Sequence, residues 1–193
     1  MRKPESDIER RRRRRRRRIQ VIIIYTAIAI GLAWFFESQA TTTVIFVRHA
    51  EKAAEPADDP GLSPAGQRRV AELTRQLVDA DVVAGVDAIY STPYRRTEET
   101  ARPVAEALDL PVNSYDAADT EAIMENIVRD HKGKIILVVG HSNTLPALIG
   151  NMGASKKVPP IADDEYDNIY IVSSPWFGKT KTIRLRYGEP YRP

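Results

Sequence analysis

The sequence of 193 residues contains no cysteine. This absence excludes a disulfide framework, a thiol nucleophile and a thiolate ligand for a metal ion. It is compatible with an oxidising compartment, because no thiol has to be kept reduced there. Histidine is also scarce, with three residues in the whole chain.

The positive charge of the chain is confined to its beginning. Residues 1–40 carry 11 basic and 4 acidic side chains, a net charge of +7, whereas residues 41–193 have a net charge of −4. The basic character therefore gives no reason to expect nucleic acid as a partner of the whole chain. About 150 residues follow position 40, the size of one ordinary domain. A composition of 42% apolar and 28% charged residues is typical of a folded chain.

Nine consecutive arginines, Arg10 to Arg18, precede an uncharged apolar stretch at residues 19–36. As a helix, this stretch would extend about 27 Å, enough to cross a thin hydrocarbon core. Its last residues are aromatic, as expected at a membrane interface. We predict a basic cytoplasmic segment at residues 1–18, a transmembrane helix or signal anchor at 19–36 and a linker at 37–41.

Other interpretations of the N-terminus remain. The arginine run could be a nucleic-acid or nuclear-targeting patch. The apolar stretch could be a core helix, although its all-round apolarity and charged flank oppose this. It could also be a signal peptide cleaved after Ala40, since Ser38 and Ala40 are small. Clustered positive charges resist translocation, so both an anchor and a signal peptide predict that the domain is periplasmic or otherwise extracytoplasmic. An anchor would leave it as a single-pass, membrane-anchored protein, whereas cleavage would release it as a secreted form.

From residue 42 the pattern alternates between strands and helices. Lys134–Val139 is a continuous apolar run, typical of a strand covered on both faces. Ser63 and Pro64 are a helix start, and the helix should run to about Ala80. The other predicted strands are 42–47, 87–91, 111–115, 168–172 and 182–186, the last near an edge; the other predicted helices are 95–108, which contains Pro103, 120–130 and 145–152. This alternation predicts an α/β fold, a three-layer sandwich with a mostly parallel central sheet, over residues 42–193.

Histidines and arginines stand where the predicted strands end. Arg48 and His49 follow the first strand, His141 follows the strand at 134–139, and Arg95 and Arg96 open the helix after the second strand. In open α/β sheets, ligands bind outside the carboxyl ends of the strands, so these side chains should converge. Guanidinium and imidazole groups together are a poor cation site and a good phosphate site. One imidazole could attack phosphorus in line while the other groups hold the oxygens.

Four segments carry a family resemblance: VRHAEK, LSPAGQ, YSTPYRRTEETA and VVGHSNT, in this order between residues 44 and 144. Together they resemble the histidine phosphatase superfamily, which has the phosphoglycerate-mutase-like fold. The resemblance implies that His49 is the phosphorylated nucleophile and His141 the second pocket histidine, with Arg48 and Arg96 holding the phosphoryl oxygens. The family spacing R-x-x-x-T-A selects Arg96 rather than Arg95.

The remaining site residues are less clearly indicated. Ser142 and Asn143 adjoin His141 and are expected to donate hydrogen bonds to substrate. The leaving alkoxide needs a proton from an acid. Relatives often carry that acid after the third strand, which favours Asp116, then Asp119, although Asp119 is also a natural N-cap. Glu51 is a third candidate, and none of the three need be catalytic.

The resemblance implies a metal-independent phosphomonoester hydrolase without cofactor that acts on a phosphorylated small molecule, glycan or phosphoprotein. Alternatives are a phosphotransferase of the phosphoglycerate mutase type and a non-catalytic phosphate-binding module. A domain of this size leaves little chain for the lid of a mutase, and no expected histidine or arginine is missing. Because Ser142 follows His141, the H-D pair of the phytase-like branch is absent.

Overall fold

The computed structural model describes residues 7–38, 41–79, 85–154 and 158–192, and the chain divides into two units, Met1–Gln39 and Ala40–Pro193. In the first unit, helix α1 (Asp7–Ser38) holds both the arginine run and the apolar stretch. Its segment Arg10–Phe36 contains an 18-residue window with a mean hydropathy of 2.2, which is long and apolar enough to cross a membrane. Gln39 and Ala40, which belong to the predicted linker and cleavage position, lie outside the described residues.

The described strands of the second unit form one mixed sheet in the order β3-β2-β4-β1-β5-β6. The strands β1 to β4 pair in parallel, while β5 is antiparallel to both β1 and β6. Five of these six described strands therefore point the same way, which confirms the mostly parallel sheet. The strands are β1 (Thr41–Arg48), β2 (Ala88–Ser91), β3 (Val112–Ser114), β4 (Ile135–Gly140), β5 (Asn168–Pro175) and β6 (Lys181–Arg186).

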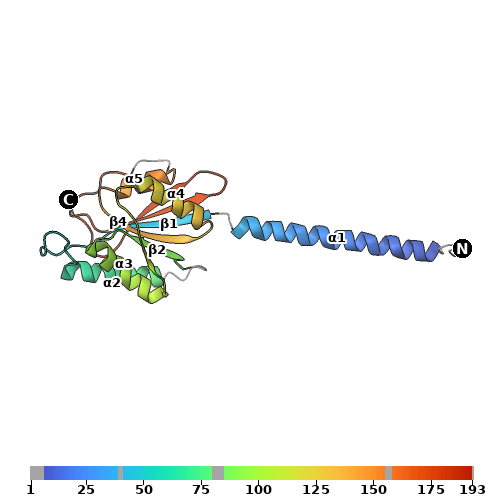
Figure 1. Ribbon diagram of the computed structural model, residues 1–193, viewed down its shortest axis with the longest axis horizontal. Helices are drawn as coiled ribbons and strands as arrows, with labels where there is room; N and C mark the ends of the chain where they lie inside the picture. The colour runs from blue at the N-terminus through green and yellow to red at the C-terminus, as the bar shows by residue number, and fades with distance from the viewer. Residues whose placement is uncertain (1–6, 39–40, 80–84, 155–157, 193) are drawn as a thin grey trace. The chain divides into compact units, whose positions relative to one another are not determined.

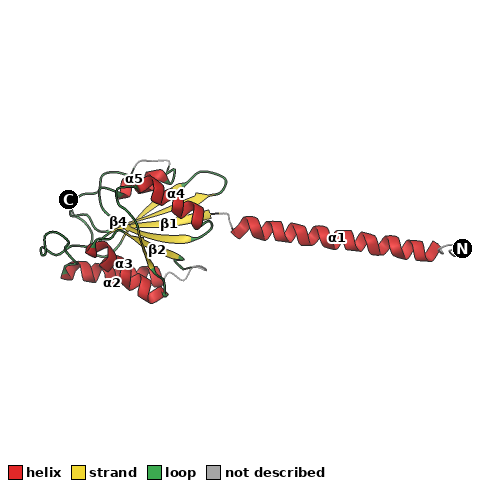
Figure 2. Ribbon diagram, viewed as in Figure 1, coloured by secondary structure: helices red, strands yellow, loops and turns green. Residues whose placement is uncertain are grey.

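Helices cover both faces of the sheet (Figures 1 and 2). One layer consists of α2 (Pro64–Val78) and α3 (Arg95–Leu108), and the other of α4 (Thr120–Asp130) and α5 (Leu145–Asn151). The three-layer α/β sandwich is thus confirmed. Strand β6 is exposed along its whole length, which agrees with its predicted place at an edge.

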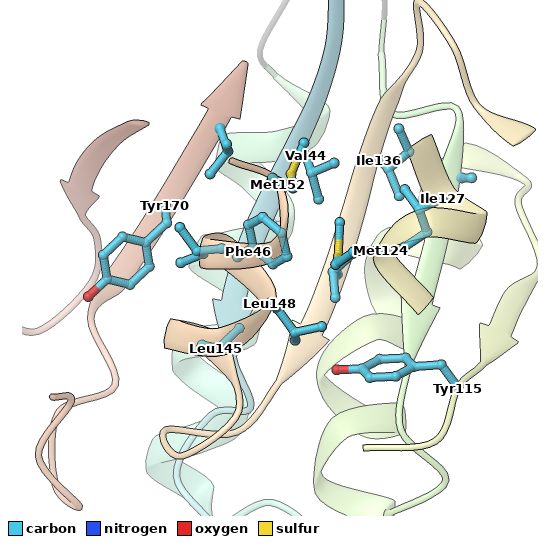
Figure 3. Close-up of a cluster of buried hydrophobic side chains, with 14 of the residues drawn as sticks. Val44, Phe46, Tyr115, Met124, Ile127, Ile136, Leu145, Leu148, Met152 and Tyr170 are labelled. Atoms are coloured by element: carbon cyan, nitrogen blue, oxygen red, sulfur yellow. The ribbon is translucent and has the colours of Figure 1, made fainter. Parts of the chain in front are cut away.

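Strand β4 shows why the sheet needs both layers. Its side chains alternate, so that Ile136 and Val138 join the core under α4 and α5, while Leu137 and Val139 join the core under α2 and α3. All four are fully buried. Figure 3 shows the first of these cores, where side chains from α4 and α5 pack on those of β1 and β4. The continuous apolar run therefore has the two-sided burial that its sequence predicts.

Side-chain hydrogen bonds cap the first turns of α2 and α4. The Ser63 hydroxyl accepts from the backbone N–H of Gly66 at 3.1 Å and caps α2, a contact typically worth about 1 kcal/mol. The Asp119 carboxylate caps α4 in the same way by accepting from Ala122 N–H at 3.0 Å. Helix α2 ends at Val78, and the predicted end near Ala80 lies outside the described residues. Helix α3 continues through Pro103 to Leu108.

Candidate active site

The two histidines lie side by side because β1 and β4 are neighbouring parallel strands. Arg48 pairs with Gly140 at the carboxyl ends of these strands, so His49 and His141 come next on each. The His49 N–H donates to the Gly140 carbonyl at 3.0 Å, and the two imidazole centroids are 5.3 Å apart. A Cβ on Gly140 would lie 2.9 Å from the Tyr115 hydroxyl, so this strand end has no room for a side chain.

His49 is buried and held in one tautomer. Its Nδ1 lies 2.8 Å from the carbonyl oxygen of Ala50, which can only accept, so Nδ1 carries the proton and Nε2 keeps its lone pair. Burial lowers the pKa of His49 to about 3, with further lowering by Arg48, His141 and Arg96, against a smaller opposing effect of the Ala50 bond. The imidazole is therefore neutral near pH 7, the state that a nucleophile requires.

Two buried threonine hydroxyls fix the tautomer of His141. Its Nε2 lies 2.9 Å from Thr92 Oγ1, which lies 2.8 Å from Thr97 Oγ1. Thr97 Oγ1 donates to the backbone carbonyls of Thr92 and Tyr94, so its single proton is not available to Thr92. Thr92 must then donate to Thr97 and accept from His141, which places the proton on Nε2 and the lone pair on Nδ1. Burial, Arg96 and Arg48 lower the pKa of His141 to about 4.

Arg48 is anchored by a segment far away in the sequence. Its Nη1 donates to the carbonyls of Ala162 and Glu165, at 2.7 and 3.1 Å, and its Nη2 donates to that of Asp163 at 2.8 Å. These bonds use three of the five guanidinium N–H donors. The Arg48 Nε is buried without an acceptor among the described residues. A buried donor of this kind is what an anion oxygen would satisfy.

Arg96 and Arg95 have different surroundings at the start of α3. The Arg96 side chain is 18% exposed, lies 3.9 Å from Asp59 and lowers the pKa of both site histidines. The Arg95 side chain is 53% exposed and pairs with Glu99 at 3.2 Å. The structure therefore brings Arg96, and not Arg95, to the histidines.

Each site arginine stacks on a tyrosine that also touches a histidine. The Arg48 guanidinium carbon lies 4.1 Å from the Tyr166 ring centroid, and that ring lies 5.9 Å from the His49 ring. The Arg96 guanidinium carbon lies 4.4 Å from the Tyr94 ring centroid, and that ring lies 5.3 Å from the His141 ring. Flat aromatic faces support guanidinium groups and fix their planes. Sequence reasoning missed both tyrosines.

The three candidate acids occupy different places. Glu51 pairs with Arg69 at 2.8 Å, on the side of α2. Asp119 is the cap of α4. Asp116 is exposed and accepts from Ala118 N–H at 2.9 Å, in a turn after edge strand β3. With about 4.8 Å between strands, the backbone at the end of β3 is about 14 Å from β1. None of the described contacts links the three carboxylates to the histidines, so the acid role of Asp116 stays a prediction.

Ser142 and Asn143 line a hollow of about 320 Å³. Its lining also includes Asp163, which belongs to the segment that anchors Arg48. Ser142 is half-buried and Asn143 is exposed. The hollow therefore lies next to the residues that follow His141 and to the segment that binds Arg48. A group that bears a phosphate would have room there. Its other lining residues are Pro146, Val158, Pro160 and Ile161.

The described residues contain no group of three or more His, Asp or Glu side chains arranged to hold a metal ion. The charges that face the histidines are those of Arg48 and Arg96, which would repel a divalent cation.

Comparison with known proteins reveals a family resemblance in part of the chain. Residues 44–119 match the sequence model described as histidine phosphatase superfamily (branch 1). Residues 44–119, less than half of the chain, thus carry the sequence pattern of the histidine phosphatase superfamily. The match covers the strand end at Arg48 and His49 and the start of α3, while His141 lies beyond it. No curated protein sequence gives a significant match.

Solved histidine phosphatases share this fold. The protein histidine phosphatase SixA, solved with tungstate, is 19% identical, with a TM-score of 0.60 over 75% of this chain and 96% of its own. Mycobacterial glucosyl-3-phosphoglycerate phosphatase is 13% identical, with a TM-score of 0.58 over 76% of this chain and 98% of its own. Bacillus stearothermophilus YhfR is 17% identical, with a TM-score of 0.54 over 68% of this chain and 90% of its own. At these identities the likeness establishes the fold.

Proposed function

We propose that this histidine phosphatase hydrolyses phosphomonoesters through a phosphohistidine on His49. The observation that carries the proposal is the state of His49, which is buried, neutral and protonated on Nδ1, beside two arginines. In the first step, Nε2 attacks phosphorus and the bond to the ester oxygen breaks. In the second step, water attacks the phosphohistidine, and inorganic phosphate leaves with the histidine restored.

The charge that develops on the phosphoryl oxygens would be stabilised by Arg48 and Arg96. The unsatisfied Nε–H of Arg48 supports this role, as does the position of Arg96 beside both histidines. The Nδ1 lone pair of His141 can accept from a protonated phosphoryl oxygen. We assign Ser142 and Asn143 to the hollow that receives the rest of the substrate, and Asp116 to protonation of the leaving alkoxide.

We further propose that α1 anchors the domain in a membrane, with the arginine run in the cytoplasm and the phosphatase domain outside. The length and apolarity of residues 19–36 and the nine arginines that precede them support this orientation. The named relatives act on phosphorylated protein histidine and on a phosphorylated glycoside. We therefore expect a phosphorylated small molecule, glycan or phosphoprotein as the substrate.

The test is turnover of a panel of phosphosugars, phosphoamino acids and phosphopeptides by the full chain and by His49→Ala. We expect His49→Ala to be inactive and His131→Ala, which removes the histidine bonded to Tyr90, to remain active.

Quenched wild-type enzyme should carry phosphate that is labile to acid and stable to base. Activity should survive excess EDTA and be inhibited by tungstate. Turnover by His49→Ala, or loss of activity on chelation that zinc or magnesium restores, would refute the mechanism.

A further inference from the structure

The turn between β5 and β6 exposes two large aromatic side chains. Trp176 is 71% exposed and Phe177 is 93% exposed. Lys179 and Lys181 follow them and are also exposed. Exposed aromatic residues next to lysines are typical of surfaces that sit at a lipid interface, where the rings lie at headgroup level and the charges face anionic lipids.

The strand register places this turn at the end of the sheet where β1 begins. Thr41, the first residue of β1, pairs with Pro175, the last residue of β5. The red-orange end of the chain in Figure 1 shows the same hairpin. The turn at residues 176–180 is therefore adjacent to the entry of the chain into the domain.

Because few residues separate the apolar helix from β1, this end of the sheet must lie close to the end of that helix. Helix α1 ends at Ser38, and consecutive Cα atoms are 3.80 Å apart. The Cα atoms of Ser38 and Thr41 are therefore at most about 11 Å apart, whatever the path between them. If α1 spans a membrane, Thr41 and the paired Pro175 must lie close to the surface of that membrane.

We propose that the β5–β6 turn, residues 175–181, docks on the lipid interface of the membrane that holds α1. Trp176 and Phe177 enter the headgroup region, while Lys179 and Lys181 contact anionic headgroups. The proposal rests on the membrane anchorage stated under the proposed function. A lipid surface is the occupant because the tether brings it to this turn in every copy of the chain, without a second protein.

Docking sets the orientation of the active site. Because β1 has eight residues, the strand end before His49 lies about 23 Å from Thr41. The site then faces away from the bilayer. A phospholipid headgroup in the same membrane would be out of its reach, which leaves a water-soluble phosphomonoester, a phosphorylated glycan or a phosphoprotein as the substrate.

The lack of cysteine allows single-cysteine labelling of the full chain. Lys179→Cys, Asp58→Cys and Gly31→Cys would each carry an environment-sensitive fluorophore. Gly31 tolerates the change, because a Cβ there meets nothing within 4 Å. Asp58 is exposed in the loop that follows the site end of β1. Each protein is reconstituted in phosphatidylethanolamine–phosphatidylglycerol vesicles with nitroxide lipids, labelled either at the headgroup or deep in the acyl chain.

We expect headgroup nitroxides to quench most of the fluorescence at position 179 and none at position 58. Adding Trp176→Ser and Phe177→Ser to Lys179→Cys should abolish most of that quenching. Both side chains are mostly exposed, and a thermal melt of the serine variant checks that the domain remains folded. Full quenching in the serine variant, or equal quenching at positions 179 and 58, would overturn the docking.

The label at position 31 separates this proposal from the anchor on which it rests. Quenching at 31 by deep nitroxides without quenching at 179 would overturn the docking alone. Loss of quenching at both positions would overturn the docking and the anchor together. None of these readouts requires turnover, so they can be repeated with His49→Ala and are independent of the proposed chemistry.

Discussion

Arg48 and Arg96 flank the same two histidines but are held very differently. Arg48 is fixed by three backbone carbonyls of residues 162–165. Arg96 has one distant carboxylate, Asp59 at 3.9 Å, and rests on the Tyr94 ring. Arg48 therefore has its positive charge in a fixed position, whereas in the proposed reaction Arg96 would have donors available to follow the phosphoryl group as it transfers.

Replacing Arg96 tests this assignment at the level of single side chains. We expect Arg96→Ala to lower kcat/KM by on the order of 10²-fold, because it removes a donor that stabilises charge in the transition state. Arg95→Ala is the matched control and should stay within a few-fold of wild type, since Arg95 is half exposed and paired with Glu99. A large defect in Arg95→Ala with a small one in Arg96→Ala would reverse the assignment.

The histidine pKa values predict an unusual titration. Burial and the arginines hold the pKa values of His49 and His141 at about 3 and about 4, below the ordinary value of 6.5. Both rings should therefore stay neutral as the pH falls from 8 to 5. In Arg96→Gln both midpoints should rise, because one repelling charge is removed. Proton NMR of the ring Cε1–H resonances would measure this, and a wild-type midpoint near 6.5 would contradict it.

At the scale of elements, α2 supports the segment that follows His49. Gly66, in the first turn of α2, lies against the backbone of Glu51, and a Cβ on Gly66 would collide with the Glu51 carbonyl oxygen. Arg69 of the same helix pairs with the Glu51 carboxylate at 2.8 Å. Close approach of helix and loop thus requires a glycine at this position, and the motif LSPAGQ supplies it.

We expect Gly66→Ala to destabilise the fold by about 1–3 kcal/mol, the usual cost of overpacking, and to reduce turnover by shifting the backbone near His49. Gly150→Ala is the control, because Gly150 lies in α5 and a Cβ there meets nothing within 4 Å. That variant should keep full activity and gain up to about 1 kcal/mol from helix propensity. Chemical denaturation of both variants measures the difference, and equal stability would show that the contact at Gly66 relaxes without cost.

The sequence predicted the elements well because their signals are local. Strand β4 was recognisable from its apolar run, α2 from its cap and α4 from Asp119, and each has nearly the predicted bounds. The order of strands in the sheet was not accessible in this way. It depends on pairing between segments far apart, such as Thr43 with Ile135, which no local pattern records.

The site was predictable only in part for the same reason. Arg48, His49, Arg96 and His141 stand at element ends and could be listed from the sequence. Tyr94 lies within a motif and was open to detection. Tyr166 was not, because its acidic segment, residues 163–167, resembles a solvent-exposed loop. The approach of Arg48 to its carbonyls, which the sequence does not reveal, gives that segment a place in the site.

At the scale of the whole molecule, the two ends differ in charge as well as in structure. The +7 of residues 1–40 and the −4 of the remainder would lie on opposite sides of a membrane in the proposed orientation. In bacterial cells, alkaline phosphatase fused after residue 45 should therefore be active, and a reporter that works only in the cytoplasm should be inactive at the same position. The opposite result would place the phosphatase domain in the cytoplasm.

The bonds of Arg48 also bear on when the enzyme becomes active. They join residues separated by 114 to 117 positions, so they form only after the chain has been made as far as Glu165. Contacts of such long range are made late in folding, once the intervening strands and helices are in place. In the orientation that we propose, the chain would complete this site only after nearly all of it has been exported. Phosphate esters in the cytoplasm would then be protected from the proposed phosphatase while it is in transit.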